Sequence, residues 1–442
     1  MTTTGEDAAQ PASAQDASAR DRTTQFPSDP AAAAAVRAAG EAARRAAPSL
    51  ARAPEEAISA ALRAMADRLG RDPGAAGVVR AANEEDMRAA EVAGLTGALR
   101  DRLRLDDTRL KAMAASLLEL AGVAAEPASR GVRELPGGLV AEERHRPVGV
   151  IGANFEARPN VVADIASQLI KSRNAGVLRT GSAALRSAIA LADEVVAPAL
   201  ADAGLDPAAI QLVRMPGQAA AYALVSEPAL IPLVILRGSG TSTRTLALAG
   251  AQHGVRTLAH ADGGAVIYLD ASADRELAAR LIETSLDRLG VCNRLNLLLV
   301  DGERWDGFLP SVTELLTRLG ITPSLPPHDH PLGYEWALDS GREATVTIAP
   351  ADGAMAAAAL ANDETSGLAA AIVTEDRDAV DRFFNAYVGT GAFWNATPRL
   401  LDGYKLLAVP ETGINIDKVP GPRGPVTFRD LYLRQFVIVP QE

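Results

Sequence analysis

Apolar residues recur at three- and four-residue spacing from Ala31 to about Gly122, as in EEAISAALRAMADRLG and LKAMAASLLELAG. This spacing is typical of helices that bury one face, and Gly and Pro residues separate the runs. The preceding residues 1–30 lack the pattern and are rich in Ala, Ser, Thr, Asp and Pro. We therefore expect a disordered tail over residues 1–30, followed by several helices.

The pattern changes at residues 131–147, where two short strand-like runs flank Pro136-Gly137-Gly138 and predict a hairpin. From residue 148, short runs rich in Val, Ile and Leu alternate with longer helical stretches. The strand-like runs are VGVIGANF, AGVLRT, IQLVRM, LVILRG, AVIYLD, RLNLLLVD, ATVTIAP, AAAIVTED and, in the last part of the chain, FVIVP. This alternation predicts an α/β protein with parallel sheets.

Three segments between these strands predict two helices and a loop. SAALRSAIALADEVVAPALADAG reads as one long helix closed by Gly204, and ADRELAARLIETSLDRLG as a helix that ends near Gly290. Residues 321–334 are rich in Pro and predict a loop.

Length and composition narrow the class of protein. A chain of 442 residues is too long for one ordinary core, so we expect two or three domains. The net charge of -11 disfavours nucleic acid and anionic membranes as partners. No run of about 18 apolar residues predicts a membrane span, and the N-terminal residues lack the pattern of a signal peptide. We therefore expect a cytoplasmic protein with no nucleic-acid or membrane partner.

The chain has a single cysteine, Cys292, in the segment LDRLGVCNRLNLLLV. The pattern places it between a helix that ends near Gly290 and a strand that begins near Leu295. A thiol is a strong nucleophile only as thiolate, and its surroundings set its pKa. A lone cysteine is also commonly a buried apolar residue, so the residues alone leave both interpretations open.

The sequence predicts no metal site and contains no standard nucleotide motif. The five histidines are scattered, and His328-Asp329-His330 has too few neighbouring ligands, so we expect a solvated loop there. No Gly-x-Gly-x-x-Gly or P-loop pattern follows a strand-like run. Residues 178–182 and 236–240 combine Gly, a hydroxyl and Arg before a helix, which suits an anion but is also common in ordinary turns.

Six sequence blocks, taken in order, resemble one family. The blocks are Phe155-Glu156-Ala157-Arg158-Pro159-Asn160-Val161, Leu178-Arg179 with Gly181, Leu236-Arg237-Gly238, Val291-Cys292-Asn293 with the following Leu297-Leu298-Leu299-Val300, Asn395-Ala396-Thr397-Pro398-Arg399 with Asp402-Gly403, and Arg423-Gly424-Pro425. Together they resemble the glutamate-5-semialdehyde dehydrogenase family of the aldehyde dehydrogenase superfamily. The match runs from about residue 35 to the end of the sequence.

The resemblance implies an aldehyde dehydrogenase-like α/β fold with three parts. A Rossmann-like NADP-binding domain would comprise residues 31–130 and 148–260, and an α/β catalytic domain residues 261–394. Residues 131–147 and 395–442 would form a C-terminal segment and a small β oligomerisation element, in which the hairpin pairs with the last strand. Such an element implies a homodimer or homotetramer.

The resemblance also implies a reaction, the NADPH-dependent reduction of an acyl phosphate to a semialdehyde in proline biosynthesis. The acyl phosphate would be γ-glutamyl phosphate or a close analogue, and Cys292 would carry the acyl group as a thioester. The Cys292 backbone N–H and the Asn160 side chain are candidate donors to the oxyanion. Asn160 is equally suited to capping the helix that follows it.

Further site residues follow from the matched blocks. The cofactor-binding candidates are Arg179, Gly181, Ser182, Gly238, Ser239 and Glu335, and the substrate-binding candidates are Arg158, Asn293, Asn395, Thr397 and Arg399. Ser182 stands where NAD-preferring members of the superfamily often carry Glu, which favours NADPH. Glu335 would contact the nicotinamide ribose, although a solvated surface position is an alternative. Arg399 would bind a carboxylate, or is a surface charge.

Several positions depart from the family pattern and leave other functions open. Asn296 replaces the family's Glu four residues after the cysteine, and Thr397-Pro398 replaces its Ser-Thr. The stretch ending in Gly263-Gly264 lacks the Glu with which hydrolytic members activate water, in agreement with a reductase. One alternative is therefore a reductase or dehydrogenase of a different activated acyl group or aldehyde, in a specialised pathway. Another is a non-catalytic partner of an acyl kinase.

Overall fold

The computed structural model describes residues 29–95, 97–238, 240–260, 263–339 and 341–441. The tail predicted over residues 1–30 lies almost entirely outside the described residues. The first described helix begins at Pro30, and the Asp29 side chain caps it by accepting the backbone N–H groups of Ala31 and Ala32. An Asp cap followed directly by Pro is a strong start signal, so the helix begins as soon as both are present.

The region of helical spacing folds into five helices. They are α2 (Pro30–Ala51), α3 (Glu55–Gly70), α4 (Pro73–Val92), α5 (Gly97–Leu103) and α6 (Asp107–Gly122). Asp72 and Asp106 cap α4 and α6 in the same manner as Asp29 caps α2. Of the five, α2 packs directly against a parallel sheet. Helices α3 and α6 pack on each other in the core that covers the same sheet, which includes Leu62, Leu117 and Ile165.

That sheet has five parallel strands in the order β5-β4-β3-β6-β7. The strands are β3 (Val150–Phe155), β4 (Ala175–Thr180), β5 (Ile210–Val213), β6 (Leu233–Arg237) and β7 (Arg256–His260), and the helices are α7 (Val161–Lys171), α10 (Gln218–Leu224) and α11 (Gly240–His253). The first strand, β3, is central. The sheet extends from it through β4 on one side and through β6 on the other. This is a topological switch point, where open α/β sheets bind ligands outside the strand ends.

The predicted long helix over residues 182–204 is divided in the structure. It consists of a 3-10 turn (Ser182–Ala184), α8 (Leu185–Leu191), a π-helical turn (Ala192–Val196) and α9 (Ala197–Asp202). Pro198 stands in the first turn of α9, and a proline lacks the N–H that a continuous helix requires. The π-helical turn at Ala192–Val196, with its wider hydrogen-bond spacing, therefore results from the missing N–H of Pro198.

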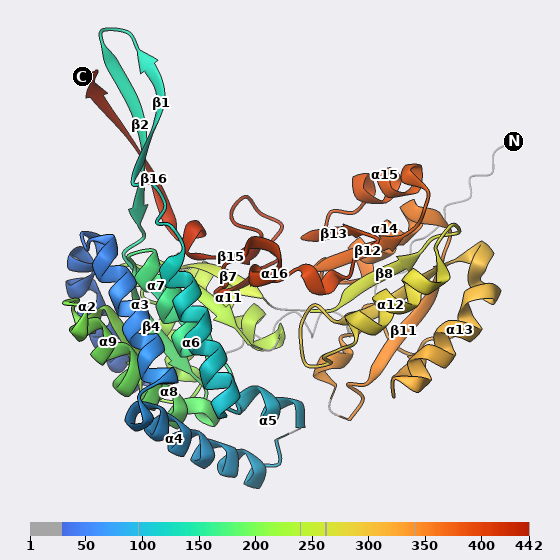
Figure 1. Ribbon diagram of the computed structural model, residues 1–442, viewed down its shortest axis with the longest axis horizontal. Helices are drawn as coiled ribbons and strands as arrows, with labels where there is room; N and C mark the ends of the chain where they lie inside the picture. Colours follow the sequence, from blue (N-terminus) through green and yellow to red (C-terminus); the bar gives the residue numbers. More distant parts are fainter. Residues whose placement is uncertain (1–28, 96, 239, 261–262, 340, 442) are drawn as a thin grey trace, which may run out of the picture.

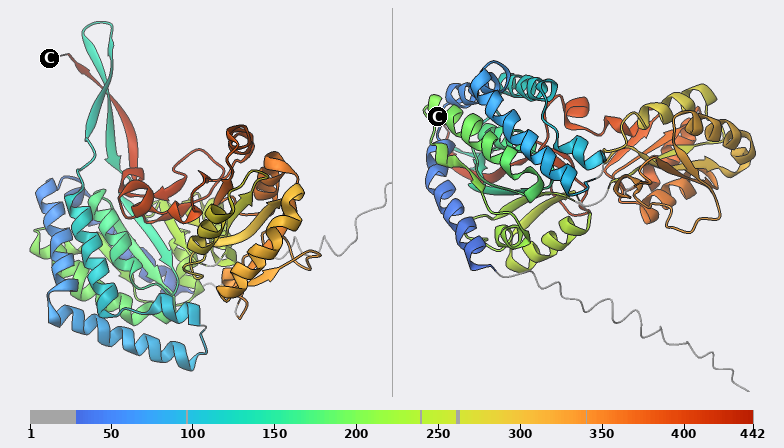
Figure 2. Two further views of the ribbon diagram at one scale, coloured as in Figure 1. Left: turned by 45° about the vertical axis from the view of Figure 1, so that its right-hand side comes forward. Right: turned by 90° about the horizontal axis from the view of Figure 1, so that it is seen from below.

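A second parallel sheet has six strands in the order β10-β11-β9-β8-β12-β13. The strands are β8 (Ala265–Leu269), β9 (Leu295–Asp301), β10 (Thr322–Ser324), β11 (Thr345–Ala351), β12 (Ala369–Val373) and β13 (Gly391–Trp394), and the helices are α12 (Arg275–Ser285), α13 (Trp305–Arg318), α14 (Gly353–Glu364) and α15 (Arg377–Ala386). The predicted loop at 321–334 thus contains a short strand. Figure 2 shows the two parallel sheets side by side, each with its own covering helices.

A third, antiparallel sheet projects from the five-stranded part (Figure 1). It contains β1 (Ser129–Leu135), β2 (Leu139–Pro147) and β16 (Tyr432–Pro440), in the order β1-β2-β16. The predicted hairpin is confirmed, and Gly137 and Gly138 adopt the positive φ angles, 83° and 71°, that its turn requires. The implied pairing of the hairpin with the last strand is confirmed as well, because β16 runs antiparallel to β2 along its whole length.

The segment between β13 and β16 returns the chain from the six-stranded sheet to the five-stranded one. It includes α16 (Gly403–Leu407) and a small sheet of β14 (Gly413–Asn415) and β15 (Gly424–Val426). Among the described residues, no helix combines the length and the apolar character needed to cross a bilayer.

Candidate active site

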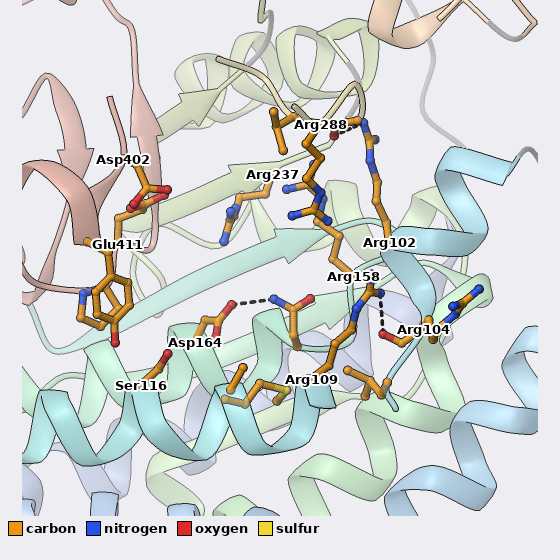
Figure 3. A pocket seen from close by; sticks show the side chains of 18 residues that line it. Arg102, Arg104, Arg109, Ser116, Arg158, Asp164, Arg237, Arg288, Asp402 and Glu411 are labelled. Atoms are coloured by element: carbon orange, nitrogen blue, oxygen red, sulfur yellow. Dashed lines mark hydrogen bonds between the residues drawn. The ribbon is translucent and has the colours of Figure 1, made fainter. Parts of the chain in front are cut away.

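A cavity of about 380 Å³ lies where the helical region, the five-stranded sheet and the segment preceding β9 meet (Figure 3). Five chain segments contribute to its wall. The lining residues are Arg102, Arg104, Leu105, Arg109, Ala112, Met113, Ser116, Arg158, Asn160, Asp164, Arg237, Arg288, Gly290, Val291, Asp402, Tyr404, Pro410 and Glu411. The cavity is therefore assembled from positions that are far apart in the sequence.

Charge is distributed unevenly around this cavity. Its lining includes six arginines and three carboxylates, so its excess charge is positive although the whole chain is acidic. Figure 3 shows Asp402 and Glu411 at one end and Arg102 and Arg288 at the other, with Arg237 between them. A small anion such as a phosphate ester would match the arginine end.

Two of these arginines have carboxylates nearby but form no close ion pair with them among the described residues. Within the part of the chain that the structure describes, the guanidinium groups of Arg158 and Arg237 form no hydrogen bond or ion pair. Burial, followed by the nearby charges of Arg237 and Arg102, lowers the pKa of Arg158 to about 10. Crowded, desolvated cations of this kind are stabilised when an anion binds between them.

Arg102 connects the helical region to the cysteine segment. Its Nη2 donates to the carbonyl oxygen of Gly290 over 2.8 Å, while its buried Nε has no hydrogen-bond partner among the described residues. Burial lowers the pKa of this guanidinium, and the negative charges of Cys292 and Glu335 oppose that effect. Arg102 can therefore hold the cysteine segment with one nitrogen and offer another to a ligand.

Asn160 lines the cavity and does not cap α7. Its side chain makes no capping bond, and its Nδ2 instead donates to Asp164 Oδ2 over 2.8 Å. Burial raises the pKa of Asp164 to about 6, against the lowering effects of Arg237, Asn160 and Arg158. Of the two roles left open by the sequence, the structure removes capping and leaves the Asn160 amide facing the cavity.

Cys292 lies beside the cavity, directly after the lining residues Gly290 and Val291. The helix predicted to reach Gly290 is shorter than expected, since α12 ends at Ser285. Cys292 lies in the turn between α12 and β9, and β9 begins at Leu295 as predicted. Its carbonyl oxygen accepts the N–H of Gly264 over 2.7 Å. This turn is held by contacts with distant residues, among them the bond from Arg102, so helical spacing did not indicate where α12 ends.

The surroundings of the Cys292 thiol affect its pKa in opposite directions. Burial has the largest effect and raises the pKa, while the positive charges of Arg158 and Arg237 lower it. Glu411 and Glu335 raise it further. The thiol thus lies within electrostatic reach of both the arginines and the carboxylates of the cavity. An anion that binds to the arginines would therefore change its reactivity.

Glu335 is half-buried and lies beside the cysteine segment, rather than on a solvated surface. Gly263 lies between the Glu335 carboxylate and Cys292. A Cβ added at Gly263 would lie 2.7 Å from Glu335 Oε1 and 2.8 Å from the Cys292 carbonyl oxygen. Only a glycine permits this approach. The carboxylate is therefore near enough to the thiol to act on a group bound beside it.

The proposed cofactor residues lie at the carboxyl ends of β4 and β6. Gly181 follows β4, and a Cβ there would meet no atom within 4 Å, so the surface above it is open. Ser182 starts the next helical turn, and Arg179 bonds to Asn154 and Gly217 while its buried Nε has no partner among the described residues. The open surface and the Ser182 hydroxyl fit the ribose and phosphate groups of a dinucleotide, whereas two nitrogens of the buried Arg179 are already bonded to protein groups.

The β6 side of the switch point is more crowded. A Cβ at Gly238 would lie 3.1 Å from the Glu156 carboxyl group, which also accepts a hydrogen bond from Ser242 at 2.9 Å. Ser239, the remaining cofactor candidate on this side, lies outside the described residues. Among the described residues, the Gly181 side is thus the more open of the two.

Four of the five predicted substrate residues lie outside the cavity lining, and each bonds to other protein groups. Arg399 donates to Asp287 at 2.8 Å and also to Asn293, whose amide donates to the Leu401 carbonyl at 3.0 Å. Asn395 bonds twice to the Thr374 backbone, and Thr397 bonds to Ser285, each over 3.0 Å or less. Of the set, only Arg158 lines the cavity, and the substrate roles of the others stay predictions.

Sequence reasoning did not single out most of the charged lining. Arg237 stood within a matched block but was not named as a ligand, and Asp164 lies one helical turn beyond Asn160. Arg102, Arg288 and Glu411 carried no local signal, since their approach depends on tertiary packing. No group of three or more residues among the described positions has the ligands for a metal ion. His328 and His330 instead contact Ser324.

Comparison with known proteins identifies the family. The model of the aldehyde dehydrogenase family matches residues 16–330. The chain is 35% identical over 425 residues to a γ-glutamyl phosphate reductase of Anaeromyxobacter dehalogenans, covering 92% of this chain and 96% of the relative. The corresponding protein of Geobacter metallireducens is 31% identical over 360 residues, or 79% of this chain and 84% of the relative. The chain belongs to the aldehyde dehydrogenase family, in its γ-glutamyl phosphate reductase branch.

Solved structures agree with this family at the level of the fold. The γ-glutamyl phosphate reductase of Thermotoga maritima superposes with a TM-score of 0.82 at 24% identity, over 91% of this chain and 98% of that one. An acetylating aldehyde dehydrogenase of Geobacillus thermoglucosidasius gives a TM-score of 0.68 at 16% identity. The expected aldehyde dehydrogenase-like fold is therefore confirmed. As a family member, the chain is an oxidoreductase that acts on an aldehyde group, and the family implies a nicotinamide cofactor.

Proposed function

We propose that this member of the aldehyde dehydrogenase family reduces γ-glutamyl phosphate, or a close analogue, to the semialdehyde with NADPH in proline biosynthesis. The observation that carries the proposal is the cavity, in which Arg158 and Arg237, unpaired among the described residues, lie within electrostatic reach of the only cysteine. A dianionic phosphate is the group that such a site binds best. The named relatives act on a substrate of this class.

In the proposed first step, the Cys292 thiolate attacks the acyl carbon and the bond from that carbon to the phosphate oxygen breaks. Phosphate leaves with the bonding electrons, toward Arg158, Arg237 and Arg102. Asn160 has one amide hydrogen engaged by Asp164 and can offer the other to the carbonyl oxygen as negative charge develops there. The acyl group then remains on Cys292 as a thioester.

In the second step the thioester becomes an aldehyde and Cys292 returns as a thiolate. The cofactor, when bound, supplies the hydride. Gly181, Ser182 and Arg179 would hold its adenosine end, and Glu335, beside Cys292, is placed to contact the ribose of its nicotinamide end. Ser182 in place of an acidic residue favours a 2′-phosphate, so Ser182→Glu should raise the KM for NADPH far more than that for NADH.

The reverse reaction gives the most direct test. Purified protein is mixed with racemic glutamate-5-semialdehyde, NADP⁺ and inorganic phosphate, and formation of NADPH is followed by absorbance. We expect NADPH formation that depends on phosphate and is lost in Cys292→Ser, whose hydroxyl is a far weaker nucleophile in this setting. Full activity in Cys292→Ser would contradict the nucleophile assignment.

The other outcomes identify the alternatives. A protein that binds NADP⁺ but gives no signal would act on a different activated acyl group or aldehyde, as the substitutions at Asn296 and Thr397-Pro398 would allow. A protein that binds no nucleotide would fit a non-catalytic partner of an acyl kinase. Binding of both nucleotides can be measured by calorimetry on the same preparations.

The proposal includes assembly into a homodimer or homotetramer in the cytoplasm. Its support is the projecting sheet of β1, β2 and β16, on which Leu433, Phe436 and Ile438 are exposed. Apolar side chains on a projecting sheet are usually covered by another chain. Light scattering on wild-type protein and on Phe436→Glu would show whether this sheet carries the interface.

A further inference from the structure

The side chain of Asn296 joins two backbone groups that flank Glu335. Asn296 is the second residue of β9, four residues after Cys292, and only 2% of it is exposed. Its Nδ2 donates to the carbonyl oxygen of Tyr334 over 2.7 Å, and its Oδ1 accepts the backbone N–H of Trp336 over 3.2 Å. The amide therefore fixes the backbone immediately before and immediately after Glu335.

The packing around these bonds is tight. Gly264 has a φ of 91°, and a Cβ there would lie 3.0 Å from the Asn296 Cβ, so no larger residue fits between β8 and this side chain. Trp336 is fully buried, and its Nε1 donates to Thr347 Oγ1 over 2.9 Å. The 334–336 segment is thus anchored to the six-stranded sheet, and Asn296 sets the orientation of the residue in its middle.

We propose that Asn296 is a positioning residue, which holds Glu335 against Gly263 and so keeps a negative charge beside the Cys292 thiol. An amide is the side chain that makes both bonds, because a carboxylate at this position could accept from Trp336 but could not donate to Tyr334. The inference rests on the proposed function in one respect, that Cys292 is the nucleophile whose reactivity matters.

The consequence for the thiol follows from the charges that face it. Arg158 and Arg237 favour the thiolate, and Glu411 and Glu335 oppose it, while burial opposes it most. Glu335 is the member of this set whose backbone is fixed on both sides by one side chain. Loss of the two Asn296 bonds should let the carboxylate move toward water and away from the sulfur, which makes the thiolate easier to form.

The experiment measures the rate of Cys292 alkylation by iodoacetamide against pH in the full-length protein, which has no other thiol. Glu335→Gln should shift the alkylation midpoint to lower pH, so that alkylation at a fixed neutral pH becomes several-fold faster. Asn296→Leu should shift it in the same direction. The double variant should shift it no further than Glu335→Gln alone, because both substitutions remove the same charge from the thiol.

Asn362 provides a matched control. Its Nδ2 donates to the Ala386 carbonyl and its Oδ1 accepts the Val388 N–H, each over 2.9 Å, so it holds the two sides of Tyr387 as Asn296 holds the two sides of Glu335. Asn362→Leu removes the same two kinds of bond in α14. It should lower thermal stability while leaving the alkylation profile unchanged.

Several results would overturn the inference. These are an unaltered profile in folded Asn296→Leu while Glu335→Gln shifts it, additive shifts in the double variant, and an equal shift in Asn362→Leu. If Asn296→Leu does not fold, Asn296→Ser, whose hydroxyl is too short to reach both backbone groups, serves in the same comparison. Alkylation requires no substrate, so this test can fail while the reverse reaction succeeds, and the reverse reaction can fail while this test succeeds.

Discussion

Two regions of the molecule contain partly or fully buried arginines of opposite character. In the cavity, Arg158 and Arg237 have no hydrogen-bonded or ionic partner within the described part of the chain, and each faces other cations. Near the end of β13, Arg399 is bonded to Asp287 and Asn293. All three stand in sequence blocks shared with the family, so residue identity does not separate them. The three arginines differ in the protein groups to which they are already bonded.

The difference has a physical basis. An arginine whose donors already bond to protein acceptors gains little from a ligand, whereas a desolvated arginine without acceptors gains both charge compensation and hydrogen bonds. The cavity arginines therefore contribute to binding at the expense of stability, and Arg399 contributes to stability. Four substitution experiments follow from this contrast.

The largest effect is expected from removal of both cavity arginines. In Arg158→Gln combined with Arg237→Gln, kcat/KM for the phosphate-dependent reaction should fall by about 10³-fold, since two hydrogen bonds to a charged group contribute roughly 1.5–3 kcal/mol each. The free energy of unfolding should change little, because the double variant removes repulsion between the arginines together with their attraction to Asp164. A fall in kcat/KM of less than about tenfold would show that the cavity is not the phosphate-binding site.

Asp164 tests whether the cavity carboxylates neutralise these arginines. Burial raises its pKa from an ordinary 3.8 to about 6, so the folded protein holds this proton more tightly than the unfolded chain does. That contribution to stability is present below the unfolded pKa and is lost as pH rises through about 6, which leaves a penalty of roughly 3 kcal/mol above it.

Asp164→Asn should therefore raise the free energy of unfolding by about that amount near pH 8, and by less near pH 5. Urea titrations at the two pH values measure the difference. The amide can still accept the bond from Asn160. A variant that is less stable at the higher pH would show instead that Asp164 forms a stabilising ion pair with Arg237.

Arg399 should behave in the opposite way to Arg158. Arg399→Gln leaves the Asn293 carbonyl oxygen without its charged donor, so the free energy of unfolding should fall by about 1–3 kcal/mol. The folded variant should keep kcat/KM within a few-fold of the wild type. Lost activity with unchanged stability would instead support the carboxylate-binding role that the sequence suggested for Arg399.

The smallest effect concerns the thiol itself. Because Arg158 lowers the pKa of Cys292, Arg158→Gln should shift the alkylation midpoint to higher pH, and Arg399→Gln should leave it in place. The two variants remove the same charge from two different regions, so each is the control for the other. Equal shifts would mean that the two arginines act on the thiol through the overall charge of the protein.

Sequence patterns predicted the local parts of this structure well. The runs that form β3, β4, β8 and β9 are short, apolar and bounded by turn residues. Their secondary structure is therefore determined by residues that are close in the sequence. The hairpin at Gly137 and Gly138 is local in the same sense. The segment that became β7, Arg256–His260, was missed, because its mixed polar composition gives no strand signal away from the sheet.

What could not be predicted depends on contacts between distant segments. α12 ends at Ser285 rather than near Gly290, and the turn that follows it is tied to α5 through Arg102. Asn160 lines the cavity and does not cap the helix because its side chain is oriented toward Asp164, which the sequence does not indicate. Matched blocks named Arg158 and Arg399 as equal candidates, and only their surroundings distinguish them.

The cavity draws its wall from residues as far apart as Arg102 and Glu411. Each parallel sheet can acquire its strands from nearby parts of the chain, but the cavity exists only after the returning segment at 402–411 has closed against α6. Contacts of such long sequence separation form late, because the entropy of the intervening loop must be lost first. On refolding, helical and sheet structure should therefore form before the protein can bind phosphate. A folding intermediate that lacks only the contact of residues 402–411 with α6 would have both parallel sheets but no phosphate-binding cavity.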